Sequence, residues 1–314
     1  MAKANIAVAD PIRAFDEFRD DPAAPLRTGI IHPVNDRSIT AAIMAANLGL
    51  INPVLIGPMA RIELAAAQAE LDLANFEIVD APHSHAAAEI GVSMAASGKV
   101  NALMKGALHT NELMAATLNG PTSLRTERRM SHVFVMRTNA YPKWLMISDG
   151  ALNISPDLTA KKWIVQNAID LAHAIGIESP RVAILSATEE VDPAILSTLD
   201  AAALCKMADR SQITGGRLDG PLAFDLAVSA DAVVAKGLTS DVAGAADILI
   251  VPNLEGGNMM AKQLDYLAGA AAAGLVLGAS VPIILNSRSD SVDERVASCA
   301  LARRYHTWRT KAGT

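Results

Sequence analysis

The chain has 314 residues; 51% are hydrophobic, 19% are charged, and the formal net charge is −6. This length exceeds that of most single domains, so we expect two domains or one large α/β unit with a sizeable core. The negative charge argues against binding to nucleic acid or to an anionic membrane by bulk attraction, so an anionic ligand has to be held by local cations.

The first half of the chain alternates short apolar runs with helical patterns. The runs predict strands at residues 29–33, 53–57, 76–79 and 100–104, and the patterns predict helices at residues 36–46, 59–71 and 85–96. Asp36 is expected to cap the first of these helices. Strands separated by one helix each predict parallel pairing, because a parallel crossover needs a dozen residues or more. The pattern is typical of a doubly wound sheet.

In the middle of the chain, two apolar runs follow each other without a helical pattern between them, and the alternation of strands and helices then resumes. Residues 132–136 and 144–148 are apolar runs joined by a short polar link, which predicts a hairpin at a sheet edge or domain junction. Beyond them, we expect strands at residues 182–186 and 247–251 and helices at residues 158–174, 193–207, 221–236 and from about 257. Pro221 suits the first turn of its helix.

The C-terminal part contains a charge-free stretch at residues 266–285. Its glycines and Pro282 predict a helix end and two short strands, and we expect no membrane span. The apolar residues from 281 to 285 read as a buried strand that leads directly into a helix start. We therefore expect unpaired backbone N–H groups and the positive end of a helix dipole there, beside a hydroxyl and a guanidinium.

The cysteines and several missing motifs indicate the cellular compartment of the protein and the types of reaction that it does not catalyse. Cys205 and Cys299 form no CxxC pair and have no metal-ligand spacing, and the N-terminus resembles no secretion signal, so we expect a reduced, cytoplasmic protein without a metal site. The sequence lacks GxxxxGK[ST], GxGxxG after a strand, HExxH and GxSxG, which argues against nucleotide hydrolysis, common hydride transfer, zinc proteolysis and common serine hydrolysis.

Polar residues follow three predicted strands. They are Lys105–Gly106, Gly256–Gly257–Asn258 and Ser287–Arg288. Ligands of open α/β sheets bind beyond the carboxyl ends of the strands, so we expect these residues to share one cleft between two domains.

Several ordered segments resemble the phosphate acetyl/butyryltransferase family, most closely its butyryl-type branch. They include residues 101–106 (NALMKG), 124–132 (LRTERRMSH), 185–191 (LSATEEV), 219–225 (DGPLAFD), 246–252 (ADILIVP) and 287–290 (SRSD). The resemblance implies a two-domain, doubly wound α/β protein with isocitrate/isopropylmalate dehydrogenase-like architecture and an interdomain cleft. We expect a first domain of residues 1–140 plus 287–314, a second of residues 141–286, and a homodimer or higher homo-oligomer.

The same resemblance implies a function. Members of this family move a short-chain acyl group, acetyl to butyryl, between coenzyme A and inorganic phosphate, so that acyl-CoA and phosphate give acyl phosphate and coenzyme A. Transfer is expected to be direct within a ternary complex, without a metal, a covalent acyl-enzyme or a tightly bound cofactor. Such chemistry needs an anion pocket, donors for an oxyanion and a group that takes the thiol proton.

The resemblance also assigns roles to individual residues. Ser287 is expected to orient the thiol, Arg288 to stabilise phosphate and carbonyl, and Arg129 to lie near the phosphate, which its bidentate fork suits. Further substrate contacts are expected from five residues at or near loop tips, Lys105, Gly106, Gly257, Asn258 and Lys262.

The general base is expected to be Asp290, three residues after the serine as in butyryl-type members. The acetyl-type pattern has an aspartate seven residues after the serine, and Glu294 is this alternative base. Ser291 and Glu294 stand in the S-x-x-E relation of a capping box, so Glu294 has a structural explanation as well. A turn role for Asp290, an N-cap role for Asn258 and a solvent-facing position for Lys262 also stay open.

Two other function classes remain. The first is a metal-dependent dehydrogenase or decarboxylase of the same superfamily, although the sequence shows no aspartate cluster for its metal. The second is a non-catalytic acyl-CoA-binding protein, because Tyr266 stands near where acetyl-type members have an arginine.

Overall fold

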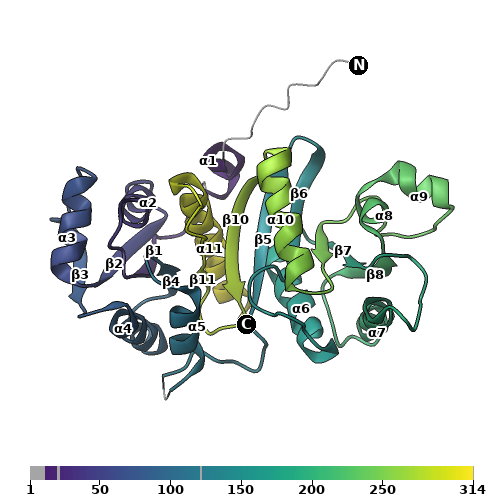
Figure 1. Cartoon of the computed structure of the whole chain (residues 1–314), viewed down its shortest axis with the longest axis horizontal. Helices are drawn as coiled ribbons and strands as arrows, with labels where there is room; N and C mark the ends of the chain where they lie inside the picture. The colour runs from purple at the N-terminus through teal and green to yellow at the C-terminus, as the bar shows by residue number, and fades with distance from the viewer. Residues whose placement is uncertain (1–10, 20–21, 121, 314) are drawn as a thin grey trace. The chain divides into compact units, whose positions relative to one another are not determined.

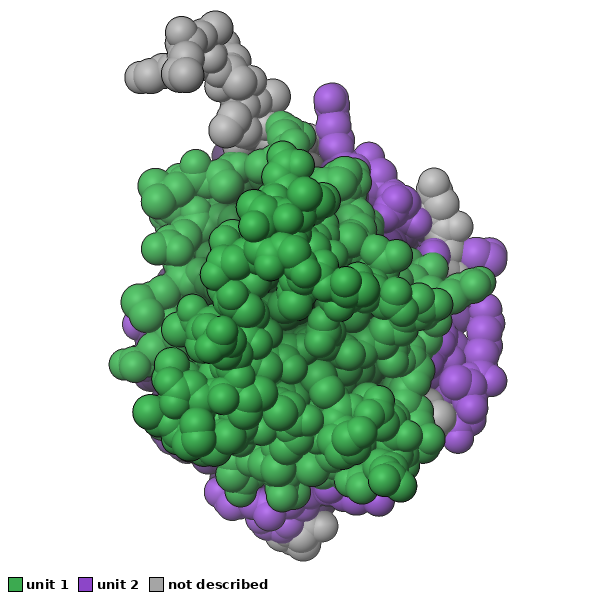
Figure 2. Space-filling model, turned by 90° about the vertical axis from the view of Figure 1, so that its right-hand side faces the viewer, with its two compact units in different colours: residues 1–10, 129–272 green, residues 11–128, 273–314 purple. Residues whose placement is uncertain are grey.

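The computed structural model describes residues 11–19, 22–120 and 122–313, which belong to two compact units (Figures 1 and 2). Unit 1 comprises Arg129–Ala272, and unit 2 comprises Pro11–Arg128 with the C-terminal segment from Ala273. The units therefore divide at 128/129 and 272/273, whereas the sequence places the boundaries at 140/141 and 286/287.

Unit 2 contains strands in the order β3-β2-β1-β4-β11-β10, except that the first two residues of β10 belong to unit 1. Their bounds are Glu77–Asp80 (β3), Ile51–Gly57 (β2), Leu26–Ile31 (β1), Ala102–Lys105 (β4), Ile283–Ile284 (β11) and Ala271–Leu277 (β10). All neighbours from β3 to β11 pair in parallel, and β10 pairs antiparallel to β11. The predicted parallel pairing of the first half is confirmed. The carboxyl ends of β1, β4 and β11 thus meet at one edge of the sheet.

The helices of unit 2 have the bounds Pro11–Ala14 (α1), Asp36–Asn47 (α2), Met59–Gln68 (α3), Ser84–Ala96 (α4), Thr110–Leu118 (α5) and Val292–Ala312 (α11), with a 3-10 turn at Asp16–Phe18. Two of these helices, α2 and α11, begin where the short polar side chains of Asn35 and Ser291 cap them. Asn35, rather than the predicted Asp36, caps α2 by accepting the Ser38 N–H at 3.0 Å. Helix α5 has no counterpart in the sequence prediction, and its first turn lies beside the loop that follows β4.

The charge-free stretch is divided as predicted. Helix α10 ends at Ala268, and β10 and β11 follow as two short strands. Within the described residues, no helix combines the length and hydropathy that crossing a membrane requires. The last strand is shorter than expected, because only Ile283 and Ile284 pair, and a loop of residues 285–291 separates it from α11. The expected direct passage from strand to helix is therefore wrong.

Unit 1 contains strands in the order β5-β6-β9-β7-β8. Their bounds are Ser131–Thr138 (β5), Tyr141–Ser148 (β6), Ile248–Ile250 (β9), Arg181–Leu185 (β7) and Arg217–Leu222 (β8). Strands β5 and β6 form the predicted antiparallel hairpin, and the other neighbours pair in parallel. The unit's helices are Leu158–Ala174 (α6), Leu196–Asp209 (α7), Phe224–Val228 (α8), Ala230–Lys236 (α9) and Leu254–Ala268 (α10).

Two helix predictions in unit 1 are wrong. Pro221 does not start a helix but lies in β8, whose place at the end of the strand order tolerates a residue without an N–H. The region then forms two short helices, because Ser229 ends α8 and its hydroxyl accepts the Ala232 N–H at the start of α9. Helix α10 begins at Leu254 instead of near Gly257, because Asn253 caps it.

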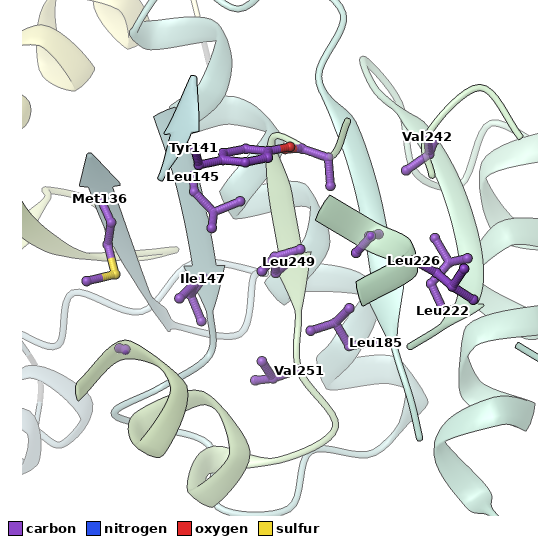
Figure 3. Packing of buried hydrophobic residues seen from close by; sticks show 14 of the residues in the cluster. Met136, Tyr141, Leu145, Ile147, Leu185, Leu222, Leu226, Val242, Leu249 and Val251 are labelled. Carbon is purple, nitrogen blue, oxygen red and sulfur yellow. The ribbon is translucent and has the colours of Figure 1, made fainter. Parts of the chain in front are cut away.

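One cluster of buried hydrophobic residues in unit 1 lies between its sheet and helices α8 and α10 (Figure 3). It includes Leu145 and Ile147 from β6, together with Leu249 from β9. Tyr141 joins this cluster through its ring, and its hydroxyl donates to the Ala246 carbonyl at 2.7 Å. Burial raises the pKa of Tyr141 to about 12. The packed sheet fixes the carboxyl end of β6, from which the next loop starts.

Candidate functional site

The predicted site residues fall into two groups, one in each unit. Unit 2 contains six of them, Lys105, Gly106, Ser287, Arg288, Asp290 and Glu294, and unit 1 contains four, Arg129, Gly257, Asn258 and Lys262. Lys105, Gly106, Ser287 and Arg288 lie at or just after the carboxyl ends of strands, as the sequence predicts, whereas Arg129 precedes the amino end of β5.

Asp290 shapes the loop that presents Ser287 and Arg288. Its carboxylate accepts the Ser287 N–H at 2.7 Å and the Asn286 side-chain amide at 3.4 Å. The Asp290 N–H donates back to the Ser287 carbonyl at 3.3 Å. The Ser287 hydroxyl is exposed and lies 3.0 Å from the Ser289 hydroxyl. Asp290 therefore acts as a turn residue in this structure, and it holds the segment that presents the exposed Ser287 hydroxyl.

Arg288 is exposed and lies beside helix α5. Its Nη2 atom is 3.1 Å from Nδ1 and 3.0 Å from Nε2 of His109, which precedes α5. Its carbonyl oxygen accepts from the Arg37 guanidinium at 2.9 Å. The β4–α5 and β11–α11 loops thus meet at this guanidinium, which is available to an anion on its exposed side.

Arg295 supports the same loop from beneath and is absent from the sequence prediction. It is 4% exposed; Nη2 donates to the Ser287 carbonyl at 2.6 Å, and Nε donates to the Asp290 carbonyl at 3.4 Å. Its buried Nη1 has no hydrogen-bond partner among the described residues. Burial is the main cause that lowers the pKa of Arg295. The available signal was an arginine at the start of an otherwise small and apolar run in α11.

Lys105 ends β4 and brings a second buried cation to this loop. It is 3% exposed, and Nζ donates to the Asn286 carbonyl at 3.4 Å. Burial, with the nearby charges of Arg295 and Arg288, lowers the pKa of Lys105 to about 8. The site therefore contains three positive groups around the Ser287 segment, and burial makes an unpartnered cation costly there.

Gly106 packs closely against the backbone at the end of β1. A Cβ atom at this position would lie 2.4 Å from the Ile31 carbonyl oxygen, so only glycine fits. Its N–H already donates to that carbonyl at 2.9 Å. The backbone of Gly106 is thus committed to β1, and its contribution is to bring the start of the β4–α5 loop close to β1.

Glu294 forms the capping box that its spacing allows. Its carboxylate accepts from the N–H and hydroxyl of Ser291 at 2.7 and 2.9 Å, and the Ser291 hydroxyl accepts the Glu294 N–H at 3.2 Å. The expectation that backbone N–H groups stay unpaired here is wrong for Ser287, Ser291 and Glu294, because side chains of the segment occupy them. Positive charge at this site comes chiefly from cationic side chains.

In unit 1, Arg129 is held by a loop that follows β6. Its Nε donates to Asn153 Oδ1 at 2.8 Å, and the Asn153 amide donates to Asp149 at 2.5 Å. Asp149 is 2% exposed and also accepts the N–H groups of Ala151 and Leu152. Neither Asp149 nor Asn153 was predicted, although an aspartate before glycine at a strand end gave a usable signal.

Helix α10 docks against this loop through Gly257 and Asn258. A Cβ on Gly257 would lie 2.7 Å from the Asp149 carbonyl oxygen. The Asn258 side chain donates to the Gly150 carbonyl at 3.1 Å. Asn258 lies inside α10, so its expected alternative as the N-cap is wrong; Asn253 has that role. Both residues position the loop that holds Arg129.

Lys262 interacts within its own helix. Its Nζ lies 3.3 Å from Asp265 and 5.5 Å from the centre of the Tyr266 ring. Tyr266 is exposed, so this cation lies on an exposed part of α10.

Two chemical routes receive no support from the described residues. Burial raises the pKa of both cysteines, Cys205 and Cys299, to about 12, so neither forms a reactive thiolate near neutral pH. No group of three or more His, Cys, Asp or Glu side chains in the described part of the chain could hold a metal ion.

Comparisons with known proteins agree on one family. Residues 85–303 match the family described as "Phosphate acetyl/butaryl transferase". The chain is 56% identical over 289 residues to a phosphate acetyltransferase of Rhizobium meliloti, covering 92% of each chain. It is 42% identical over 254 residues to a phosphate butyryltransferase of Clostridium acetobutylicum, covering 81% of this chain and 84% of that one. The sequence predicts a closer resemblance to the butyryl-type branch, but of these two relatives the acetyltransferase has the higher identity to this chain.

A solved structure shows the same fold. It is a branched-chain phosphotransacylase from Enterococcus faecalis V583, which aligns with a TM-score of 0.79 at 27% identity and covers 90% of this chain and 99% of its own. The mixed α/β fold of this chain is therefore that of a phosphotransacylase structure.

Proposed function

Because the chain belongs to the phosphate acetyl/butyryltransferase family, we propose that it transfers a short-chain acyl group between coenzyme A and inorganic phosphate. The observation that carries this proposal is the loop of unit 2, where Ser287 and Arg288 are exposed above two buried cations, Lys105 and Arg295. A chain with a net charge of −6 concentrates positive charge there, as binding of a phosphate and a coenzyme requires.

The reaction needs little beyond positioning and electrostatic stabilisation. A phosphate oxygen attacks the thioester carbonyl, the carbonyl oxygen becomes an oxyanion, and the C–S bond then breaks to release the coenzyme thiolate. Arg288 supplies a forked donor for the phosphate and the oxyanion. The Ser287 hydroxyl donates a hydrogen bond to the departing sulfur. In reverse, the coenzyme sulfur attacks the carbonyl carbon of the acyl phosphate, and phosphate leaves.

Direct transfer, without a covalent acyl-enzyme, fits the side chains that are present. Cys299 is buried and Cys205 is partly buried, and the pKa values of both thiols are raised, which removes the usual sulfur nucleophile. The Ser287 hydroxyl lies beside Ser289 in the described structure, where no histidine or carboxylate activates it. We therefore propose a ternary complex of enzyme, acyl donor and acceptor, with coenzyme A as a substrate and no tightly bound cofactor.

We further propose that both units act on the same substrates. Arg129 in unit 1 and Arg288 in unit 2 would bind one phosphate, as the isocitrate/isopropylmalate dehydrogenase-like architecture with an interdomain cleft requires. A cytoplasmic homodimer or higher homo-oligomer belongs to the same proposal. The acyl group lies between acetyl and butyryl, since relatives with both names share most of the chain.

A thiol-release assay tests the function. The purified protein is incubated with acetyl-, propionyl- or butyryl-CoA, with and without phosphate, and free thiol is measured. We expect phosphate-dependent release for at least one thioester. Coenzyme A binding without such release would identify a binding protein instead, and nicotinamide-dependent oxidation that requires a divalent metal would identify a dehydrogenase.

The variant Arg288→Ala tests the loop. Loss of the forked donor should lower kcat/KM by about 10²- to 10³-fold, because a donor to the developing oxyanion is removed. Arg210→Ala removes an exposed arginine beyond helix α7 and serves as the matched control, with unchanged activity expected. Circular dichroism should show the same fold for both variants. Equal activity of the two would refute the assignment of Arg288.

A further inference from the structure

When coenzyme A attacks an acyl phosphate, its thiol loses a proton, and the residue roles given above assign no acceptor for that proton. The coenzyme thiol must lose its proton to become a nucleophile, so a base is needed close to Ser287. Both carboxylates of the loop already accept N–H donors of the same segment: Asp290 binds the Ser287 N–H, and Glu294 binds the Ser291 N–H. Their hydrogen bonds fold the loop, and turning either one toward a thiol would open it.

Lys105 is a buried titratable side chain that reaches this loop, whereas His109 is exposed and its ring nitrogens face the Arg288 guanidinium. An ammonium group has three N–H donors, yet among the described residues Lys105 Nζ has one acceptor, the Asn286 carbonyl, at a long 3.4 Å. That carbonyl belongs to the peptide bond that joins Asn286 to Ser287. The amine thus lies next to Ser287, the residue proposed to orient the sulfur. Its surroundings are buried and offer too few hydrogen-bond acceptors for a charged ammonium group.

We propose that Lys105, as a neutral amine, takes the thiol proton of coenzyme A during attack on the acyl phosphate. The S–H bond breaks as a new N–H bond forms on Nζ, and the sulfur electron pair attacks the carbonyl carbon. The C–O bond to phosphate then breaks, and its electron pair leaves with the phosphate oxygen. In the opposite direction, the Lys105 ammonium returns the proton to the departing thiolate. This inference rests on the proposed acyl transfer.

The charges around Lys105 suit a group that cycles between two protonation states. Arg288 faces it from the loop and Arg295 from α11, and both disfavour the ammonium; Asp290 of the loop and Glu112 of α5 favour it. Burial outweighs these carboxylates and lowers the pKa of Lys105 to about 8. A base titrating near the working pH combines a useful neutral fraction with the ability to hold the proton.

The central experiment compares wild type with Lys105→Arg. Arginine keeps a positive charge but does not deprotonate in this range, so it separates proton transfer from anion binding. Initial rates with coenzyme A and acetyl phosphate are measured from pH 6 to 9.5. Wild-type kcat should rise with pH and level off above about 8. Lys105→Arg should lose about 10²-fold or more in kcat and lose this rise, with KM for acetyl phosphate changed only a few-fold.

A second variant guards against misfolding. Lys105→Ala, verified as folded by its melting curve, leaves space for a small amine, and ethylamine should restore turnover in proportion to its free-base concentration. Lys105→Arg with near wild-type kcat and an unchanged pH profile would overturn the inference and leave Lys105 as an anion-binding residue. Absence of acyl transfer by the wild-type protein would instead remove the proposed function itself.

Discussion

Glu294 illustrates how a residue in a catalytic position can serve the fold. Its carboxylate accepts from the Ser291 N–H and hydroxyl, and this completes a capping box at the start of α11. The spacing of these two residues predicts the box, whereas the resemblance allows a base at the same position. The hydrogen bonds favour the structural role.

We therefore expect Glu294→Gln to keep turnover within about threefold of wild type, because the amide oxygen can still accept the capping hydrogen bonds. The matched variant Ser291→Ala removes the cap without touching the carboxylate and should lower the free energy of unfolding by about 1 kcal/mol. Both are checked by kcat and by urea unfolding. A loss of 10²-fold in kcat for Glu294→Gln alone would restore Glu294 as the base.

The arginines of unit 2 show that one residue type takes opposite roles in different surroundings. Arg288 is exposed and is available to bind substrate, whereas Arg295 is 4% exposed and donates to the carbonyls of Ser287 and Asp290. A buried guanidinium is costly unless its donors are used, so Arg295 orders the loop that presents Arg288. Replacing either one by lysine would lose the forked geometry.

At the scale of elements, helix α10 fixes the loop that holds Arg129. Its first turn packs so closely on Asp149 and Gly150 that Gly257 has no room for a side chain. The loop in turn orients Arg129 through Asn153. The neighbouring Gly256 has no such close contact, so the two adjacent glycines of this turn differ in how tightly they are packed.

This difference gives a paired prediction. Gly257→Ala places a Cβ 2.7 Å from the Asp149 carbonyl oxygen and should lower the free energy of unfolding by about 1–3 kcal/mol. Gly256→Ala is the control, because its Cβ would have no neighbour nearer than 3.4 Å; it should be neutral or stabilising by less than about 1 kcal/mol. Urea denaturation of both variants measures the contrast. Equal stability of the two would contradict tight docking of α10.

At the scale of the whole molecule, the proposed function needs groups from both units to act on one phosphate. Arg129 belongs to unit 1 and Arg288 to unit 2. Their guanidinium groups have the same geometry and both are exposed, so each can bind phosphate oxygens in pairs. Substitutions at the two sites should then be coupled in energy, although they lie far apart in the chain.

A double-mutant cycle measures this coupling. Arg129→Ala, Arg288→Ala and the double variant are compared by kcat/KM for phosphate. We expect the combined loss to be smaller than the product of the single losses, with a coupling energy of about 0.5–3 kcal/mol. The pair Arg210→Ala and Arg288→Ala provides the uncoupled reference. Strictly multiplicative losses for the first pair would show that the two arginines act on separate ligands.

Elements with strong local signals could be predicted from the sequence, and elements with weak ones could not. Helix α6 was placed at residues 158–174, the bounds it has in the structure, because a capping Asp157 and a long periodic pattern define it. Helix α5 was missed because it is short, and strand β8 was missed because it contains Gly220 and Pro221, which are unusual inside a strand. Pro221 was assigned to a helix because the sequence does not reveal that its strand ends the strand order.

By itself, the sequence determined the α/β class, the parallel strands of the first half, the family and the loop tips where polar residues gather, because periodicity, caps and ordered motifs are local properties of the chain. Tertiary structure decided how those residues are used. Burial beside two arginines makes Lys105 a weakly basic amine, the Ser287 N–H engages Asp290, and contact with the Asp149 loop gives Gly257 a packing role. Desolvation and close contact depend on residues that are distant in sequence, so they appear only after the chain has folded.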